Sequence, residues 1–299
     1  MSLLVVGSVA IDSVETPCGT ADEVMGGSAV YFSYAASVFG KVRLVGAVGQ
    51  DFPEEFYQAL HERPIDLEGL DVLDGETFRW EGRYRGDMAQ AETRDVKLNV
   101  FEDFQPEVPE SFRDSAFVFL ANGSPYTQMH VLDQIDSPQF ALADTMNLWI
   151  ENERDGLLQL MERVDALILN DAEARQLSED ANLLRAARWI CKRGPEYCIV
   201  KKGEHGSLLR GPDDIFVLPA FPSENLTDPT GAGDSFAGGF MGYLASQRDV
   251  NMNNLKQGLA HGTVTASFTL EDFSTERIGN VTSDEFEQRM DRFLRCTQL

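Results

Sequence analysis

Residues 228–235 read Asp-Pro-Thr-Gly-Ala-Gly-Asp-Ser, and no other stretch of the chain constrains its chemistry as strongly. Apolar residues at helical spacing follow it, among them Phe236, Phe240 and Tyr243. The pattern predicts a helix that begins near Gly231, where unpaired N–H groups and the positive end of the helix dipole can hold an anion. Asp234 adds a carboxylate beside that anion. An anion cradle next to a base is what phosphoryl transfer to a hydroxyl requires.

Composition is that of an ordinary globular protein, except for its charge. The 299 residues include 49 Asp and Glu against 25 Lys and Arg, which gives a formal net charge of -24. A field of that sign disfavours nucleic acid and anionic membranes as partners. We find no signal peptide pattern, no apolar run long enough to span a bilayer, and no metal-ligand spacing among the four cysteines. We therefore expect a cytoplasmic protein.

Short apolar runs that suit buried strands alternate with helix-sized segments such as 155–163 and 182–192. This alternation predicts an α/β fold with a mostly parallel sheet and helices on both faces. Ligands of such sheets bind beyond the carboxyl ends of the strands, where several runs end in a glycine or polar residue. The runs span 3–6, 42–48, 117–120, 140–143, 166–169 and 197–200.

Residues 77–85 break this rhythm, because Phe78, Trp80 and Tyr84 alternate with charged side chains. The alternation resumes at 96–101, so the two segments predict an antiparallel ribbon with one apolar face. The ribbon is either a lid over the main body or an ordinary hairpin at the edge of the main sheet. As a lid, it would expose its apolar face, and two copies pairing there would form a homodimer.

The motif at 228–241 resembles the C-terminal motif of the PfkB/ribokinase family of carbohydrate and nucleoside kinases. Further resemblances occur in family order over nearly the whole chain: Gly7-Ser8 with Asp12, Gly26-Gly27, Asn170-x-x-Glu173, Gly203-x-x-Gly206 and Ala260-His261. The resemblance implies a single ribokinase-like domain over 1–299, with a small β lid contributed by about 13–25 and 76–104.

The resemblance also implies an activity, the ATP-dependent transfer of the γ-phosphoryl group to a hydroxymethyl group. Asp234 would be the catalytic base, and the N–H groups of Gly231, Ala232 and Gly233 would complete the anion site. We expect a small sugar as the acceptor, as in ribokinases and fructokinases, with a nucleoside as the alternative. A catalytically silent binding protein is less favoured, because the acid and the glycines are all retained.

On the acceptor side, the resemblance implies that Asp12 binds substrate hydroxyls and that Gly26 and Gly27 let the sugar lie against the backbone. Each also has a purely structural interpretation, as a turn after the first strand or a turn into a helix. Two positions depart from the family pattern. Tyr31 stands where an asparagine is usual, and Asn122 stands where some members have a sugar-contacting acid. Both are candidate substrate-binding residues.

On the nucleotide side, the resemblance implies that Glu173 holds Mg²⁺ through water, although Asn170 and Glu173 also fit a capping box. Lys201 replaces the usual small hydroxyl residue, and its side chain either reaches ATP phosphates or lies in solvent. Asp228 and Thr230 belong to the loop that binds a monovalent cation in several relatives, so K⁺ is a further candidate. The remaining candidates are Gly203, Gly206 and His261 for ATP, and Asp144 and Asn147 as neighbours of the pocket.

Overall fold

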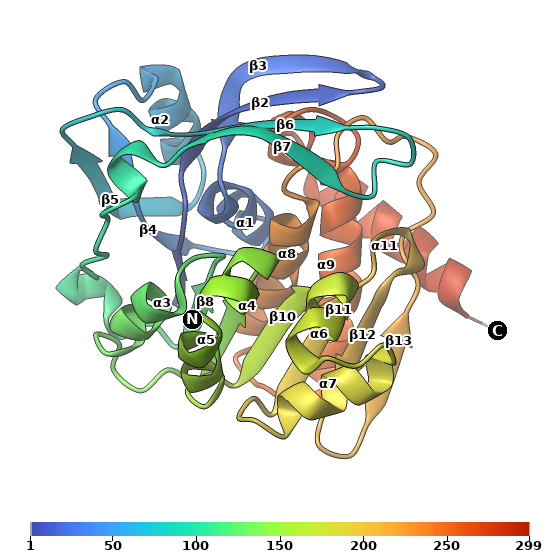
Figure 1. The fold of residues 1–299 in the computed structure, drawn as a ribbon. Helices are drawn as coiled ribbons and strands as arrows, with labels where there is room; N and C mark the ends of the chain where they lie inside the picture. Colours follow the sequence, from blue (N-terminus) through green and yellow to red (C-terminus); the bar gives the residue numbers. More distant parts are fainter. Residues whose placement is uncertain (1, 299) are drawn as a thin grey trace.

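The computed structural model describes residues 2–298 and contains two sheets of unequal size. The larger sheet has the strand order β13-β12-β11-β10-β9-β8-β1-β4-β5 (Figure 1). Strands β11, β10, β9, β8, β1, β4 and β5 of this sheet run parallel to one another. Strands β12 and β13 complete one edge in antiparallel orientation. The strands are β1 Leu3–Val6, β4 Val42–Gly49, β5 Ile65–Leu73, β8 Phe117–Leu120, β9 Phe140–Asp144, β10 Ala166–Asn170, β11 Tyr197–Lys201, β12 Ser207–Arg210 and β13 Ile215–Leu218.

Helices cover both faces of this sheet (Figure 1), as the alternating pattern predicted. Helices α1, α8, α9 and α11 pack against one face, and α3, α5, α6 and α7 pack against the other. The helices are α1 Ser28–Ser37, α2 Glu54–His61, α3 Pro125–Leu132, α4 Asn147–Asn152, α5 Arg154–Met161, α6 Asp171–Ser178, α7 Leu183–Cys191, α8 Ala232–Gln247, α9 Met252–Thr269, α10 Glu276–Gly279 and α11 Ser283–Thr297.

Strand β1 shows why the expected strands were found. Leu3 and Val5 belong to the core on the first face, whereas Leu4 and Val6 belong to the core on the second. A strand covered on both faces needs an unbroken apolar run, and such runs are visible in sequence. Each of the six expected runs lies within an observed strand. Within residues 2–298, no helix has both the length and the apolar character that a membrane crossing requires.

The second sheet lies across the carboxyl ends of the main strands and forms the lid (Figure 1). Because it is a separate sheet, the interpretation as an edge hairpin of the main sheet is wrong. Its order is β3-β2-β6-β7, with β2 beside β6 in parallel orientation and the two other pairs antiparallel. The lid strands are β2 Ala10–Thr16, β3 Gly19–Gly26, β6 Phe78–Tyr84 and β7 Ala91–Lys97.

The alternating pattern of the ribbon ends earlier than predicted. Strand β7 stops at Lys97, and the chain turns into the 3₁₀ helix η1, Asn99–Phe101. This turn brings the Phe101 ring to 5.6 Å from the Phe78 ring, measured between centroids. The Asn99 amide also donates a hydrogen bond to the Thr77 carbonyl at 2.9 Å. The expected alternation at 98–101 is therefore wrong, because aromatic packing draws this segment out of the ribbon.

Candidate active site

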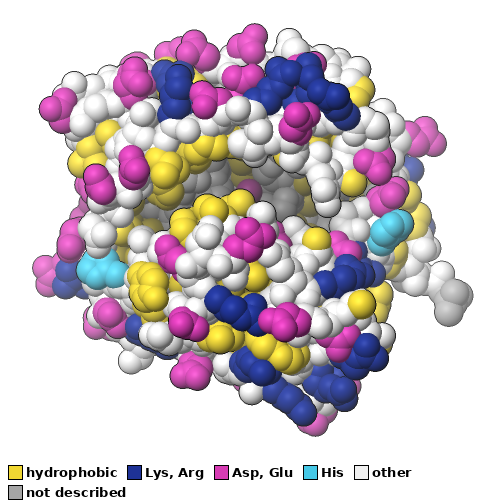
Figure 2. Space-filling model, in the orientation of Figure 1, with side chains coloured by type: hydrophobic (Ala, Val, Ile, Leu, Met, Phe, Trp, Pro, Cys, Tyr) yellow, Lys and Arg dark blue, Asp and Glu magenta, His cyan; other side chains and the backbone are white. Residues whose placement is uncertain are grey.

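A cavity of about 320 Å³ lies between the lid and the carboxyl ends of the parallel strands. Figure 2 shows the corresponding hollow across the middle of the molecule, bordered by hydrophobic side chains. Residues from both walls line it: Ser8, Asp12, Gly27, Ser28, Tyr31, Phe78, Trp80, Tyr84, Asn122, Asp144, Thr145, Met146, Asn170, Glu173, Lys201, Thr230, Gly231, Gly233 and Asp234. The structure thus brings together most of the residues that the sequence singled out.

The predicted cradle is formed by the beginning of α8. Gly231 precedes the helix with φ of 71°, a conformation that favours glycine, and a Cβ there would lie 2.2 Å from the Tyr31 ring. The Ala232 N–H donates to the Pro229 carbonyl at 3.2 Å. The N–H groups of Gly233 and Asp234 donate to no other backbone group among the described residues. They remain available for an anion at the positive end of the helix.

Lys201, at the end of β11, lies directly beside this cradle. A Cβ on Gly233 would be 3.2 Å from its Nζ, which forms an ion pair with Asp144 Oδ2 at 3.2 Å. Burial works against its charge, but the carboxylates of Asp144, Glu173 and Asp234 outweigh burial and raise the Lys201 pKa. Lys201 is thus a partly buried, charged donor next to the anion site.

Asp234 lies in the same cluster. Burial, assisted by the negative charge of Asp144 and opposed by Lys201, raises the pKa of Asp234 to about 7. A carboxylate with a pKa near neutrality is well matched to proton transfer. The position and pKa of Asp234 therefore suit a general base.

Asp12 stands on the acceptor side of the cleft, in β2. It is 4% exposed, and burial together with the nearby Asp228 and Asp234 raises its pKa to about 7, although a hydrogen bond from the Gly27 backbone opposes the shift. The two glycines that follow make room for other protein groups. A Cβ on Gly26 would lie 1.9 Å from Asp12 Oδ2, and one on Gly27 would lie 2.5 Å from the Ser8 carbonyl oxygen. Gly27 lines the cleft, whereas Gly26 is not among the lining residues.

Two hydroxyl groups in the cleft are buried without a partner. The Tyr31 and Thr145 side chains are 2% and 4% exposed, and neither hydroxyl has a hydrogen-bond partner among residues 2–298. An unpaired buried hydroxyl is costly, so a bound ligand is its natural partner. Thr145 was not expected from the sequence. Its only signal there was its place directly after Asp144, at the end of a buried strand.

Aromatic side chains line the lid side of the cleft. Phe78, Trp80 and Tyr84, which were expected on an exposed lid face, line the cleft instead.

On the body side, Trp149 Nε1 donates to Asn122 Oδ1 at 2.9 Å, and Asn122 Nδ2 lies 3.0 Å from the Met146 sulfur. Trp149 thereby fixes the orientation of the Asn122 amide, a contact that the sequence did not indicate.

Asn170 and Glu173 form the capping box that begins α6. Asn170 Oδ1 accepts from the Glu173 N–H at 2.8 Å, and Glu173 Oε2 accepts from the Asn170 N–H at 2.7 Å. Burial, increased by the charge of Asp144, raises the Glu173 pKa to about 7. The structural interpretation of this pair is therefore confirmed, and its carboxylate also faces the cleft.

The other nucleotide-side candidates lie outside the lining of this cavity. Gly203 is the first residue of a short 3₁₀ helix after β11, Gly203–His205, and Gly206 follows that helix, with φ values of 54° and 82°. The His261 ring stacks on Tyr243 at 4.0 Å and contacts Phe39 and Phe286, and none of these residues lines the cleft. The expected contact of His261 with adenine stays a prediction.

Asp228 and Thr230 form a turn immediately before the cradle. Asp228 Oδ1 accepts from the Thr230 N–H at 2.9 Å, while the buried Oδ2 has no hydrogen-bond partner among the described residues. The Thr230 hydroxyl lies 3.4 Å from the Tyr84 hydroxyl of the lid. A buried carboxylate oxygen without a donor is a fitting ligand for a cation.

Kinases of small hydroxylated substrates are the class of protein that this fold and this cleft define. Residues 2–278 match the pfkB family of carbohydrate kinases, and the chain belongs to that family. Membership makes it an enzyme that transfers a phosphoryl group from ATP to a hydroxyl of a sugar or of a nucleoside.

Relatives and solved structures agree with this assignment. A cytidine kinase from Thermococcus kodakarensis is 30% identical over 251 residues, which cover 81% of this chain and 88% of the relative. The nucleoside kinase of Methanocaldococcus jannaschii superposes with a TM-score of 0.78 at 20% identity, over 97% of this chain and 98% of that chain. A ribokinase II candidate from E. coli, solved with ATP and Mg²⁺, superposes with a TM-score of 0.80 at 16% identity, over 97% and 99% of the two chains.

Proposed function

We propose that this protein is a magnesium-dependent nucleoside kinase that transfers the γ-phosphoryl group of ATP to the hydroxymethyl group of a ribose moiety. The observation that carries the proposal is the cleft itself. It has a buried carboxylate beside an anion cradle on one wall and three aromatic side chains on the other. The carboxylate and the cradle are the evidence for phosphoryl transfer, and the aromatic side chains are the evidence for a nucleoside as the acceptor.

Asp234 is the proposed base. It removes the proton of the acceptor hydroxyl while the N–H groups of Gly233 and Asp234, at the beginning of α8, stabilise the transferred group. The expected donor Ala232 does not contribute, because its N–H is paired with the Pro229 carbonyl. Lys201 lies beside the same cradle and supplies a positive charge for the phosphates. Because phosphoryl transfer depends mainly on positioning and charge, these groups account for the protein's share of the catalysis.

Magnesium fits the donor side of the cleft. Glu173 and Asp144 are carboxylates with pKa values raised by burial, and Lys201 is the cation next to them. Carboxylates and water are the ligands that Mg²⁺ prefers, so Glu173 would hold it through water and Asn170 would keep Glu173 in place. When bound, the metal neutralises charge that develops on the phosphates.

A nucleoside suits the acceptor side better than a free sugar, which reverses the order of our expectations from sequence. Phe78, Trp80 and Tyr84 offer ring faces and edges to a base, and a monosaccharide would leave much of this aromatic surface uncovered. Asp12 would accept hydrogen bonds from ribose hydroxyls, with Gly27 at its side. Tyr31 and Asn122 would complete the contacts, and the cytidine and nucleoside kinases among the relatives support this preference.

A monovalent cation is a further proposal, for the turn at Asp228 and Thr230. The unpaired Oδ2 of Asp228 supports it. K⁺ would neutralise this oxygen directly in front of the cradle, and turnover measured in potassium and in tetramethylammonium buffers would test the proposal.

The homodimer remains a prediction, but its expected contact surface changes. The apolar side chains of β6 line the cleft, whereas Arg79 and Arg83 on the same strand form ion pairs with Glu23, Asp51 and Glu15. A dimer through the lid would therefore use charged groups together with Val96 and Leu98, which are 45% and 40% exposed. Sedimentation at micromolar concentration decides between monomer and dimer.

An ADP-release assay with MgATP across nucleosides, pentoses and hexoses tests the proposed function. We expect the highest kcat/KM for a ribonucleoside. A higher kcat/KM for a free sugar would overturn the proposed acceptor and leave the kinase assignment intact. Saturable binding of nucleosides without any ADP release would instead favour a silent binding protein.

A further inference from the structure

A second cavity, of about 480 Å³, lies between the end of α9, the short helix α10 and helix α11. It shares no lining residue with the cleft described above. Four arginines line it, namely Arg277, Arg289, Arg292 and Arg295, against two acids, Glu285 and Asp291. Such a local excess of positive charge is unusual in a chain whose net charge is -24.

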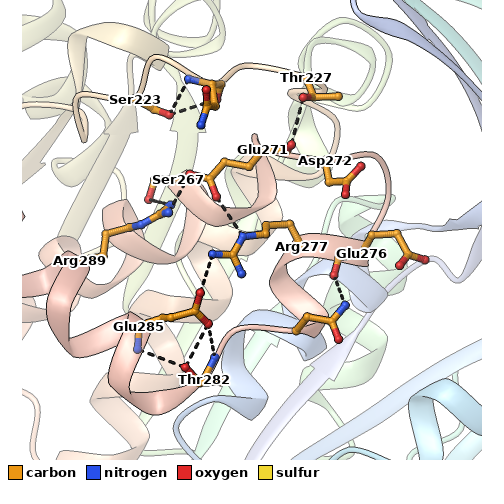
Figure 3. Close-up of polar contacts among 12 residues, drawn as sticks. Ser223, Thr227, Ser267, Glu271, Asp272, Glu276, Arg277, Thr282, Glu285 and Arg289 are labelled. Carbon is orange, nitrogen blue, oxygen red and sulfur yellow. Dashed lines mark hydrogen bonds and ion pairs between the residues drawn. The ribbon is translucent and has the colours of Figure 1, made fainter.

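Two of the four arginines are held in place by a partly buried network of ion pairs and hydrogen bonds (Figure 3). Arg277 Nε and Arg289 Nη2 bind opposite oxygens of the Glu271 carboxylate, at 3.0 and 2.7 Å. Arg277 also pairs with Glu285 at 3.1 Å, and Arg289 donates to the Ser267 hydroxyl at 3.2 Å. The Arg289 guanidinium lies 3.6 Å from the centroid of the Phe268 ring. These contacts fix two guanidinium groups at one side of the cavity.

The other two arginines, Arg292 and Arg295, are exposed, and no carboxylate of the described residues neutralises their charge in the way that Glu271 does for Arg277 and Arg289. Neither Arg292 nor Arg295 forms an ion pair with a carboxylate among residues 2–298. Helix α11 carries Arg289, Arg292 and Arg295 at i, i+3 and i+6, which places neighbouring members of this set one turn apart. Burial lowers the Arg289 pKa, and the charges of Arg277 and Arg292 act in the same direction, against the raising effect of Glu271. The positive charges of the cavity thus repel one another.

We propose that this cavity is a second ligand site, which binds a small phosphate-bearing anion through Arg292 and Arg295, with Arg277 and Arg289 at its inner side. A guanidinium group presents paired N–H donors that match phosphate oxygens, so several arginines around one hollow favour a multivalent anion. The site is separate from the proposed kinase reaction and does not depend on the identity of the acceptor.

The network also connects this cavity to the cleft. The Thr227 hydroxyl donates to the Glu271 carbonyl at 3.0 Å, and the Leu270 carbonyl accepts from the N–H groups of Thr227 and Asp228 at 2.8 and 3.3 Å. An anion that draws Arg277 or Arg289 away from the Glu271 carboxylate would loosen this segment. Occupation of the second site would thereby reach the turn that precedes the catalytic helix.

Calorimetric titration with inorganic pyrophosphate tests the site. The titration uses the full chain with Lys201→Met, which removes the cation of the cleft, so that binding there does not mask the second site. We expect saturable binding that weakens by about tenfold or more when Arg292 and Arg295 are both replaced by alanine, since charge-assisted contacts are lost.

The matched control removes two other exposed positive charges, Arg188 and Lys192 at the end of α7. The control Arg188→Ala/Lys192→Ala should bind pyrophosphate within twofold of the parent, as roughly expected for a purely long-range effect of charge. Equal weakening in both double variants, or no saturable binding to the parent, would overturn the site. Circular dichroism verifies that both double variants are folded.

Hydrogen exchange tests the connection to the cleft in the same samples. Bound pyrophosphate should speed exchange of the Thr227 and Asp228 amides in the parent and leave them unchanged in Arg292→Ala/Arg295→Ala. Unchanged exchange in a parent that binds pyrophosphate would refute the connection while the site itself stands.

Discussion

The two walls of the cleft differ in what they are made of. The wall at the beginning of α8 consists of backbone N–H groups and buried charges contributed by Asp234, Lys201 and Asp144. The lid wall consists of the rings of Phe78, Trp80 and Tyr84, all from β6. The first wall offers fixed electrostatics that suit a phosphate, whereas the second offers surface area that suits a base or a sugar face.

This difference teaches where the reaction and the substrate choice are encoded. The cradle depends on Gly231, whose φ of 71° and closeness to the Tyr31 ring leave no room for a side chain, so the turn tolerates few sequences. The lid depends on shape and apolar area, which many side chains supply. Changes to the first wall should therefore abolish turnover with any acceptor, and changes to the second should alter the choice among acceptors.

The largest effect is expected for Asp234→Asn. Loss of the base should lower kcat by about 10³-fold, because general-base catalysis contributes on that order. The affinity for ATP should remain within about threefold of the wild type, since the cradle N–H groups stay in place. Single-turnover kinetics and a nucleotide titration measure both quantities, with Asp155→Asn on the exposed side of α5 as a control. A variant with undiminished turnover would show that Asp234 is not the base.

Next in size is the effect of Gly231→Ala. The residue has φ of 71°, and the new Cβ would lie 2.2 Å from the Tyr31 ring, so the turn must shift. We expect a loss of about 2 kcal/mol in the free energy of unfolding and a fall of about 100-fold in kcat/KM.

Gly233→Ala is the matched comparison, because its Cβ would meet only the mobile end of Lys201 at 3.2 Å. It should leave stability nearly unchanged and lower kcat/KM less than Gly231→Ala does. Equal stability losses in the two variants, measured by urea unfolding, would contradict the strain argument.

The pH dependence of kcat/KM tests how Lys201 affects the ionisation of Asp234. The pKa of Asp234 is about 7, so kcat/KM should rise with pH through that value as the carboxyl loses its proton. Lys201 lowers this pKa, and Lys201→Met should therefore move the acidic limb of the profile to higher pH. A limb that stays in place, or moves to lower pH, would show that Lys201 does not stabilise the Asp234 carboxylate.

The smallest effect is expected for Tyr31→Phe, on the acceptor side. Its hydroxyl has no partner within residues 2–298, so its removal should leave the free energy of unfolding within about 0.5 kcal/mol of the wild type. KM for the nucleoside should rise by about fivefold if the hydroxyl contacts substrate. Tyr34→Phe on the same helix is the control, because Tyr34 lies outside the lining of the cleft and its ring packs under the Arg63 guanidinium at 4.7 Å. That control should leave KM unchanged, and an equal rise of KM in both variants would refute the proposed role of Tyr31.

Sequence alone predicted the features that are local. Strand β8, Phe117–Leu120, was visible because a doubly covered strand is an unbroken apolar run. The cradle was visible because Gly231, Gly233 and Asp234 are contiguous. The capping role of Asn170 and Glu173 was visible for the same reason.

What depends on contacts between distant segments was not predictable. The pairing of Trp149 with Asn122 joins two different loops, and the unpaired Thr145 hydroxyl is recognisable only once its surroundings are known. The stacking of His261 on Tyr243 was not predictable either, because the position of His261 along the chain does not reveal which face of α9 packs against α8. The direction in which the lid turns its aromatic face likewise depends on the parallel pairing of β6 with β2, two segments that lie far apart in the sequence.

The burial of Asp12, Glu173 and Asp234 has a consequence for the stability of the enzyme. Each has a pKa of about 7 in the folded protein, above the value of about 4 that the unfolded chain would show. Groups shifted in this direction favour folding below pH 4 and lose that contribution as the pH rises through 7. Activity should rise with pH over the same interval, because Asp234, the proposed base, must be ionised. The unfolding temperature should thus fall over the pH range in which Asp234 becomes ionised, and it should be higher at pH 5.5 than at pH 8.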